Sequence, residues 1–139
     1  MPYHDMGDAC SYGIIMNNQK APLDNSNVRW ALALSTDMQN IGFNAMNGEF
    51  RASALPMPDT QITHPAYFAP LEQWLKDLKL SDGYQPWNPN FAADMVKKMS
   101  DAGTDPSMLP TGDNVTKSYG MGYWKYDPAE AEKLMATAG

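Results

Sequence analysis

The sequence has few of the residues from which covalent and metal cross-links are made. Its 139 residues include one cysteine, Cys10, and two histidines, His4 and His64. A single cysteine cannot close an intrachain disulfide, and three Cys and His side chains are too few for a structural zinc site with four such ligands. We therefore expect neither kind of cross-link to hold the fold together.

Basic residues and long apolar runs are also scarce. Ten Lys and Arg stand against 16 Asp and Glu, which gives a formal net charge of -6. Because proteins bind phosphate backbones through basic surfaces, this balance argues against nucleic acid as a partner. No apolar run approaches the roughly 18 to 20 residues that cross a bilayer, and the first residues lack the basic and apolar regions of an export signal. We expect neither a membrane span nor an export signal in these residues.

Large aliphatic side chains are few as well. Leu, Ile, Val and Phe together make up 21 of the 139 residues, a share that is typical of disordered chains rather than of globular domains. However, the chain also has 11 Met, four Trp and seven Tyr, and disordered segments avoid bulky residues of this kind. We expect a folded domain with little apolar surface, as a piece of a larger protein would have.

Apolar periodicity and capping residues predict an α+β fold that is mostly helical and has few short strands. Residues 12–16 (YGIIM) form a short apolar run between turn-forming residues and predict one buried strand. Helices are expected where apolar residues recur every three or four positions between capping residues and glycine. The predicted helices span residues 26–46, 70–80, 88–103 and 127–139. Residues 51–58 are predicted to be extended, as an edge strand or an ordered loop, and residues 104–122 to be turn-rich and irregular.

Two of these helices have well-marked starts. Asn88 is expected to cap a helix whose first position is Pro89, because proline is favoured there. Asp127, followed by Pro128 and Glu130, has the spacing of a capping box.

Metal-binding and nucleophilic side chains gather near the beginning of the sequence, in His4, Asp5, Asp8 and Cys10. A metal site here would need ligands to converge from a glycine-containing segment with no rigid element beside it. No helix N-terminus or strand-to-helix turn is predicted near Cys10 that would lower the pKa of its thiol. We therefore expect no metal site, no catalytic residue and no cofactor.

Aromatic residues in the predicted loops allow two interpretations. Exposed beside Asn and Gly, they would form an adaptable recognition surface. Packed over the helices, they would extend the core, and this interpretation is favoured because large rings are more often buried. The six residues concerned are Tyr84, Trp87, Tyr119, Tyr123, Trp124 and Tyr126.

Asn17 and Asn18 follow the predicted strand directly. At the carboxyl end of a strand their amides could meet a ligand in a crevice, or they could simply be turn residues that end the strand.

The segment that begins at residue 12 carries a spaced pattern: a strand, then Asn, then Pro with an apolar residue and Asp, and then Val-Arg-x-Ala. The residues of this pattern are Tyr12, Asn17, Pro22, Leu23, Asp24, Val28, Arg29 and Ala31, with Asp37 further along the same predicted helix. The pattern resembles that of the extracytoplasmic solute-binding proteins of the peptide and nickel class of bacterial ABC importers, known as solute-binding protein family 5.

A second block, near residue 139, is similar to the Tyr-Asp-Pro helix of the same family. Its residues are Tyr126, Asp127, Pro128, Ala131, Leu134, Ala138 and Gly139. The two blocks occur in the family's order and together cover roughly a third of the chain.

The chain also departs from the family. The family's link between the loop at residues 55–58 and the Tyr-Asp-Pro helix is short, whereas here residues 59–125 form a long, helical insertion. The family's proteins are several times longer and have two lobes. The resemblance therefore implies that residues 1–139 are a single domain, a fragment of the second lobe of a type II periplasmic-binding-protein-like fold.

The function implied by the resemblance is binding rather than catalysis. Two lobes would close over an oligopeptide or a similar small solute in the periplasm or another extracytoplasmic space, and would deliver it to an ABC permease. The residues placed by position at the solute are Tyr12, Asn17, Asn18 and Arg51. Without the remaining lobe, an unpaired strand edge and apolar surface would favour self-association.

Two other classes of function remain open at this point. The chain could be a stand-alone acidic helical module that binds another protein through its Trp and Tyr loops. A small Cys/His hydrolase or metal protein is less favoured, for the reasons given above.

Overall fold

The computed structural model describes residues 13–60 and 62–139. About half of these residues are helical, and two strands of two residues each are the only strands among them. This confirms the predicted class, a mostly helical α+β fold with few short strands. The described residues do not show the type II periplasmic-binding fold that the family resemblance implies. None of their helices is long and apolar enough to cross a membrane.

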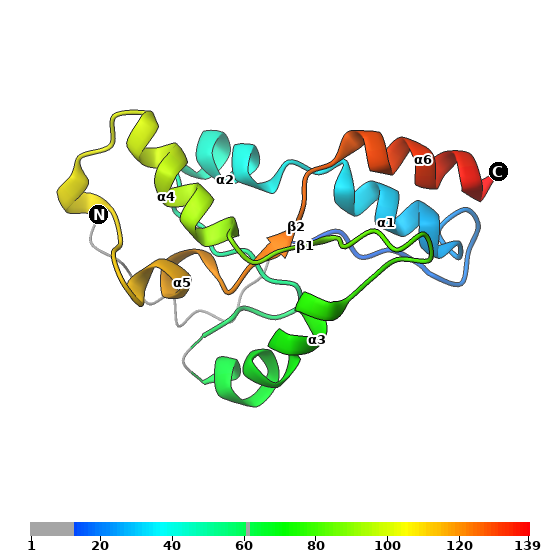
Figure 1. The fold of residues 1–139 in the computed structure, drawn as a ribbon, viewed down its shortest axis with the longest axis horizontal. Coiled ribbons are helices and arrows are strands. Elements are labelled where there is room, and N and C mark those ends of the chain that lie inside the picture. Colours follow the sequence, from blue (N-terminus) through cyan, green and yellow to red (C-terminus); the bar gives the residue numbers. More distant parts are fainter. Residues whose placement is uncertain (1–12, 61) are drawn as a thin grey trace.

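Two helices from opposite ends of the described chain form one side of the molecule (Figure 1). They are α1 (Ser26–Leu34) and α6 (Pro128–Ala138), which lie side by side. Their facing apolar residues form a small core of Ala31, Leu34, Ala131 and Leu134. The backbone N–H of Asp127 donates to the Leu34 carbonyl at 2.8 Å, which ties the start of α6 to the end of α1.

A second core lies on the other side of Figure 1, among α2 (Met38–Met46), α4 (Phe91–Asp101) and α5 (Asn114–Tyr119). Its buried residues are Ala52, Phe91, Ala92, Met95 and Tyr119. α2 contributes little buried surface of its own, with Gly42 as its buried residue. Buried apolar side chains of the described residues therefore gather in at least two separate cores.

Between the two cores lies the antiparallel pair of β1 (Trp87–Asn88) and β2 (Tyr123–Trp124). Trp87 is paired with Trp124, and the Trp124 ring also contacts the Trp30 ring of α1. Three tryptophans that are distant in the sequence therefore meet where the α1/α6 pair joins the rest of the fold.

Residues 64–77 form an arm that projects from the body in Figure 1. The arm consists of a π-helical turn, η1 (His64–Phe68), a 3-10 turn, η2 (Ala69–Leu71), and α3 (Glu72–Asp77). Another 3-10 turn, η3 (Pro106–Met108), lies outside the arm and follows α4. Phe68 and Leu75 are buried, whereas Trp74 is 57% exposed. The helix predicted over residues 70–80 is shorter in the structure, where α3 spans only Glu72–Asp77.

The prediction of a buried strand is wrong for the described residues 13–16. These residues are not assigned to a strand, and the side chains of Ile14 and Ile15 are 88% and 99% exposed. A strand needs a neighbour for its backbone groups and cover for its apolar side chains, and the described residues supply neither for this segment. Tyr12 lies outside the described residues, as do His4, Asp5, Asp8 and Cys10.

The single helix predicted over 26–46 is two helices in the structure. The Ser35 N–H donates to the Ala31 carbonyl at 2.9 Å, and the hydroxyls of Ser35 and Thr36 donate to the Leu32 carbonyl. Asp37 then caps α2 by accepting the Asn40 N–H at 2.9 Å. Side-chain capping by a Ser-Thr-Asp sequence therefore interrupts an apolar pattern that is continuous on both sides of it.

The start of α4 also differs from the prediction. Asn88 belongs to β1, and its side chain accepts the Asn90 N–H at 2.9 Å, so the helix begins only at Phe91. The segment predicted as irregular over 104–122 contains η3 and α5.

The predicted cap of α6 is confirmed in part. Asp127 is the N-cap, Pro128 is the first helical residue, and the Asp127 carboxylate accepts the Glu130 N–H at 3.0 Å. In a complete capping box the Glu130 carboxylate would also accept from the Asp127 N–H. Here the Asp127 N–H donates to the Leu34 carbonyl instead, and the buried Glu130 carboxylate accepts from Lys133 at 2.8 Å.

Candidate functional site

A cleft of about 300 Å³ opens where α2, α4 and α6 begin and β2 ends. Its volume is at the small end of the range for small-molecule sites. The described residues that line it combine aromatic rings with polar and charged side chains, and Met38 is the one aliphatic-type side chain among them. The lining residues are Asp37, Met38, Gln39, Tyr84, Asn88, Phe91, Trp124, Lys125, Tyr126 and Asp127.

Trp124 is held in the wall of this cleft by two other tryptophans. Its ring centroid lies 5.0 Å from that of Trp30 at an interplanar angle of 85°, and 5.4 Å from that of Trp87 at 73°. Edge-to-face contacts of this kind are favourable for aromatic rings. Because Trp124 is also held in the β1–β2 pair, its ring forms a rigid wall of the cleft.

Asp127 connects the cleft to both sides of the fold. Its carboxylate accepts the Glu130 N–H at the start of α6 and the Tyr84 hydroxyl at 2.8 Å. These hydrogen bonds, with that of Glu130 the stronger, lower the pKa of Asp127 below its ordinary value. Burial, and secondly the bond to Asp127, raises the pKa of the Tyr84 hydroxyl. At neutral pH the pair is therefore a phenol that donates to a carboxylate.

The other two charged groups of the cleft also have partners within the protein. The Lys125 ammonium donates to the Gln85 carbonyl at 2.6 Å and lies 5.3 Å from the centre of the Tyr84 ring. The Asp37 carboxylate accepts from the backbone and the side chain of Asn40. Asp37, Lys125 and Asp127 thus all have hydrogen-bond partners within the protein, and together they give the cleft charges of both signs.

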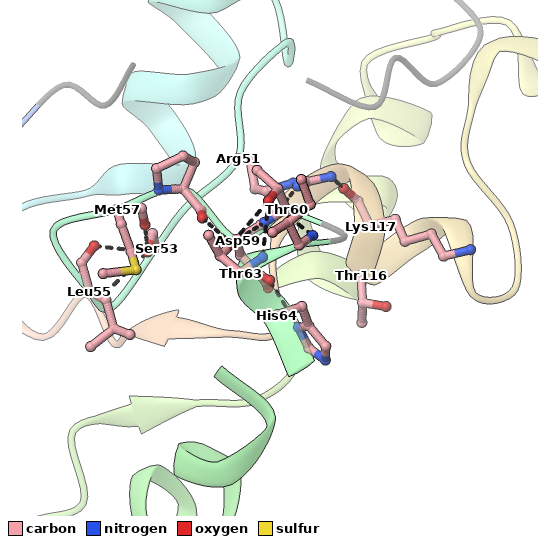
Figure 2. A network of polar contacts seen from close by, with 12 residues as sticks. Arg51, Ser53, Leu55, Met57, Asp59, Thr60, Thr63, His64, Thr116 and Lys117 are labelled. Atoms are coloured by element: carbon pink, nitrogen blue, oxygen red, sulfur yellow. Dashed lines mark hydrogen bonds and ion pairs between the residues drawn. The ribbon is translucent and has the colours of Figure 1, made fainter. Parts of the chain in front are cut away.

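Arg51, predicted at the solute, lies in a separate polar network (Figure 2). Its guanidinium donates to the carbonyls of Asp59 and Lys117, and so joins segments 66 residues apart. The buried Asp59 carboxylate lies 2.9 Å from Nδ1 of His64, and Thr63 donates to the Pro58 carbonyl at 2.6 Å. These contacts give Arg51 a clear structural role. Its contact with a solute stays a prediction.

Asn17 and Asn18 lie in an exposed turn. The Asn17 side chain accepts the Gln19 N–H at 3.0 Å, and the Asn18 side chain accepts from the Gln19 amide at 3.3 Å. Within the described residues no hydrogen bond joins either asparagine to Arg51. The predicted solute residues are therefore not brought together here, and Tyr12 is outside the described range.

The six loop aromatics divide between the two interpretations given for them. Trp87 and Tyr119 are buried, Tyr84, Tyr123 and Trp124 are partly buried, and Tyr126 is 54% exposed. The packing interpretation is thus confirmed for Trp87 and Tyr119, and the cleft uses the rings that are less covered. Sequence reasoning did not single out Gln39 or Lys125, and it named Asp37 only as part of the family pattern, since no local spacing signals that these residues would line one cleft with Tyr84.

Asp127 provides a test of how the start of α6 is stabilised. We expect Asp127→Ala to lower the free energy of unfolding by about 1 kcal/mol at pH 7, because an N-cap acceptor is lost. Asp127→Asn keeps an acceptor and should cost less. The depressed pKa means that ionised Asp127 stabilises the fold above its unfolded-state pKa of about 3.9. This stabilisation is lost as the pH falls through the lower folded-state pKa.

The measurement is urea unfolding of the wild type and Asp127→Asn from pH 7 to pH 3. The difference between their unfolding free energies should narrow below about pH 4, because Asp127 then binds a proton in the unfolded chain before it does so in the folded protein. Other carboxylates titrate in both proteins and cancel in the difference. A difference that stays constant over this range would contradict the role assigned to the Asp127 charge.

The cleft combines aromatic rings, charged groups and an amide in a small volume, a lining of the kind found in small-molecule sites. In residues 13–60 and 62–139, no group of three or more His, Cys, Asp and Glu side chains is arranged to hold a metal ion. No family model, curated protein or solved structure matches this chain.

Proposed function

We propose that the chain is part of the substrate-binding component of an ABC importer. The complete protein captures peptides or a similar small solute by closure of two lobes and delivers it to a membrane permease. The proposal starts from the resemblance to solute-binding protein family 5, and residues 1–139 then correspond to part of the second lobe. In this view the protein works outside the cytoplasm and does not catalyse a reaction.

The observation that carries the proposal is that the two resemblance blocks pack against each other. Val28 and Ala31 in the first block are buried, as are Ala131 and Leu134 in the second. Residues 38–125, 88 in number, separate the blocks, yet α1 and α6 share one core. A pattern that has arisen by chance gives no reason for its two halves to become structural partners.

The polar residues of the pattern also have structural roles. The Arg29 guanidinium donates to the carbonyls of Leu23 and Asp24, at 2.6 and 3.0 Å, and closes the Pro-containing turn onto α1. Asp127 caps α6 and is tied to the end of α1 through its backbone. The pattern therefore describes one unit, a helix pair with its turn and cap, which supports a common origin with the family's lobe.

The exposed segment at residues 13–16 is consistent with a missing neighbour. Two consecutive isoleucines that are almost fully exposed are costly in water, because each loses the stabilisation of burial, about 1.5 to 3 kcal/mol. We propose that this segment joins a sheet in the remainder of the parent protein. Tyr12, Asn17 and Asn18 would then lie at the hinge side of that sheet, facing the solute.

A stand-alone interaction module is the alternative function, and the projecting arm favours it. Tyr67 and Trp74 are 53% and 57% exposed there, and Ile62 just before the arm is 85% exposed. Exposed aromatics of this kind are enriched in protein-protein interfaces. An acidic chain that uses this arm would not need a second lobe.

The test compares the 139-residue chain with the protein encoded by its complete reading frame. In calorimetry with a mixture of short peptides, we expect binding by the complete protein and none by the chain alone, because lobe closure supplies most of the solute contacts. Binding of the peptides by the chain alone, or a reading frame that encodes no second lobe, would contradict the proposal. Loss of a protein partner on Trp74→Ala would instead support the interaction module.

A further inference from the structure

The cleft at the starts of α2, α4 and α6 has an aromatic side that is already in place. Trp124 is fixed by two edge-to-face contacts, and Tyr126 beside it is half exposed. The face of an aromatic ring carries partial negative charge and attracts the weakly positive C–H groups of a ring-shaped ligand. A rigid platform also lowers the entropy lost on binding, since few side chains must be ordered.

The hydrogen-bonding side of the cleft retains unused capacity. A lysine ammonium has three donors, and Lys125 uses one of them on the Gln85 carbonyl. The carboxylates of Asp37 and Asp127 accept hydrogen bonds within the protein but have further lone pairs. Gln39 adds both a donor and an acceptor. Donors and acceptors are thus interspersed around one small volume.

A ligand for this cleft should be neutral. The lining carries charges of both signs, two carboxylates and one ammonium, so a cationic or an anionic ligand would meet a like charge as well as an opposite one. The Tyr84 ring, where a ligand cation could otherwise lie, already carries the Lys125 ammonium. Groups that donate and accept at once, such as hydroxyls, fit the mixed lining better than ammonium or carboxylate groups.

We propose that this cleft binds a neutral polyhydroxylated ring, that is, one sugar unit. The ring's C–H face would lie on Trp124 and Tyr126, and its hydroxyls would bond to Gln39, Lys125 and the spare lone pairs of Asp37 and Asp127. The volume of about 300 Å³ suits a single ring rather than an oligomer enclosed along its length. The site consists of described residues alone, so it does not depend on the importer proposal or on a second lobe.

The test is calorimetry of the 139-residue chain against a panel of neutral mono- and disaccharides, with arginine amide and free amino acids as charged probes. We expect at least one saccharide to bind, and the charged probes to bind at least tenfold more weakly. Tyr126→Ala should weaken saccharide binding about tenfold, the equivalent of one aromatic contact. Gln39→Ala should weaken it as well, through loss of hydrogen bonds.

Trp74→Ala is the matched control. Trp74 is a similarly exposed aromatic residue on the projecting arm, outside the cleft lining, so its loss should leave saccharide affinity unchanged. The far-ultraviolet circular dichroism of all variants should match the wild type, because the substituted side chains are at least partly exposed. Absence of saccharide binding, preference for a charged probe, or equal effects of Tyr126→Ala and Trp74→Ala would each overturn the proposal. Peptide binding by the complete protein is measured separately, and none of these results would contradict the importer proposal.

Discussion

Replacement of Leu34 by alanine is expected to lower the free energy of unfolding by about 3 kcal/mol. Leu34 is completely buried, and its side chain lies between Ala31 on its own helix and Ala131 and Leu134 on α6. Two of the three other buried residues of this core are alanines, which are too short to fill the space that a shortened side chain leaves, and Trp30, Leu80 and Tyr84 pack against the same core. The cost therefore includes a cavity in addition to the lost burial.

Leu32→Ala is the control for this prediction, since the same substitution is made two positions away on the same helix. The Leu32 side chain is 45% exposed, so its truncation should cost less than about 1 kcal/mol. Urea unfolding followed by tryptophan fluorescence measures both variants. Similar losses for Leu32→Ala and Leu34→Ala would show that α1 does not pack on α6 as described, and would remove the main support for the importer proposal.

Local signals in the sequence were sufficient for several elements. Asp127 and Pro128 predict the start of α6, because capping and a fixed proline φ depend on neighbouring residues alone. α4 was found for the same reason, although Asn88 was taken as its cap. The mostly helical class follows from such short-range patterns. The predicted ends of a helix are wrong by a few residues where two neighbouring residues could each cap it.

Contacts between distant segments could not be predicted in this way. Tyr84 meets Asp127 across 43 residues, and Arg51 meets Lys117 across 66. Nothing in the spacing of these residues indicates which partner each will have, because the loops between them set the distance. The cleft depends on such long-range pairings, among them Tyr84 with Asp127 and Trp87 with Trp124, and so its lining was recognised only in part, through its aromatic residues.

At residues 13–16 a clear local pattern gave a wrong prediction. The composition of this segment predicts a buried strand, and its isoleucines are nevertheless exposed. Burial is a property of the whole assembly, whereas apolar composition is a property of the segment. The same contrast explains why Asn17 and Asn18, predicted at the end of that strand, have only local contacts within the described residues.

Replacement of Gly122 by alanine is expected to be about as damaging as Leu34→Ala, with a loss of about 3 to 4 kcal/mol. Gly122 has a φ of 147°, a conformation that costs a residue with a side chain about 1 to 3 kcal/mol. An added Cβ would also lie 2.4 Å from Cζ2 of Trp87 and 2.9 Å from the carbonyl oxygen of Asn88. The Trp87 ring is buried and in contact with Trp124, so it cannot move aside without disturbing the junction of the two cores.

Gly83→Ala separates the two causes of this loss. Gly83 has a φ of 87°, but an added Cβ there would meet no atom within 4 Å, so only the backbone strain of about 1 to 2 kcal/mol should appear. Urea unfolding of both variants measures the difference, and near-ultraviolet circular dichroism reports the packing of the tryptophans. We expect Gly122→Ala to be the less stable variant by about 2 kcal/mol, with an altered tryptophan signal that Gly83→Ala does not show, because only the former pushes Trp87 away from Trp124. Equal losses with unchanged spectra would mean that Trp87 does not pack on Gly122, and the Trp124 wall of the cleft would then lack the support on which sugar binding depends.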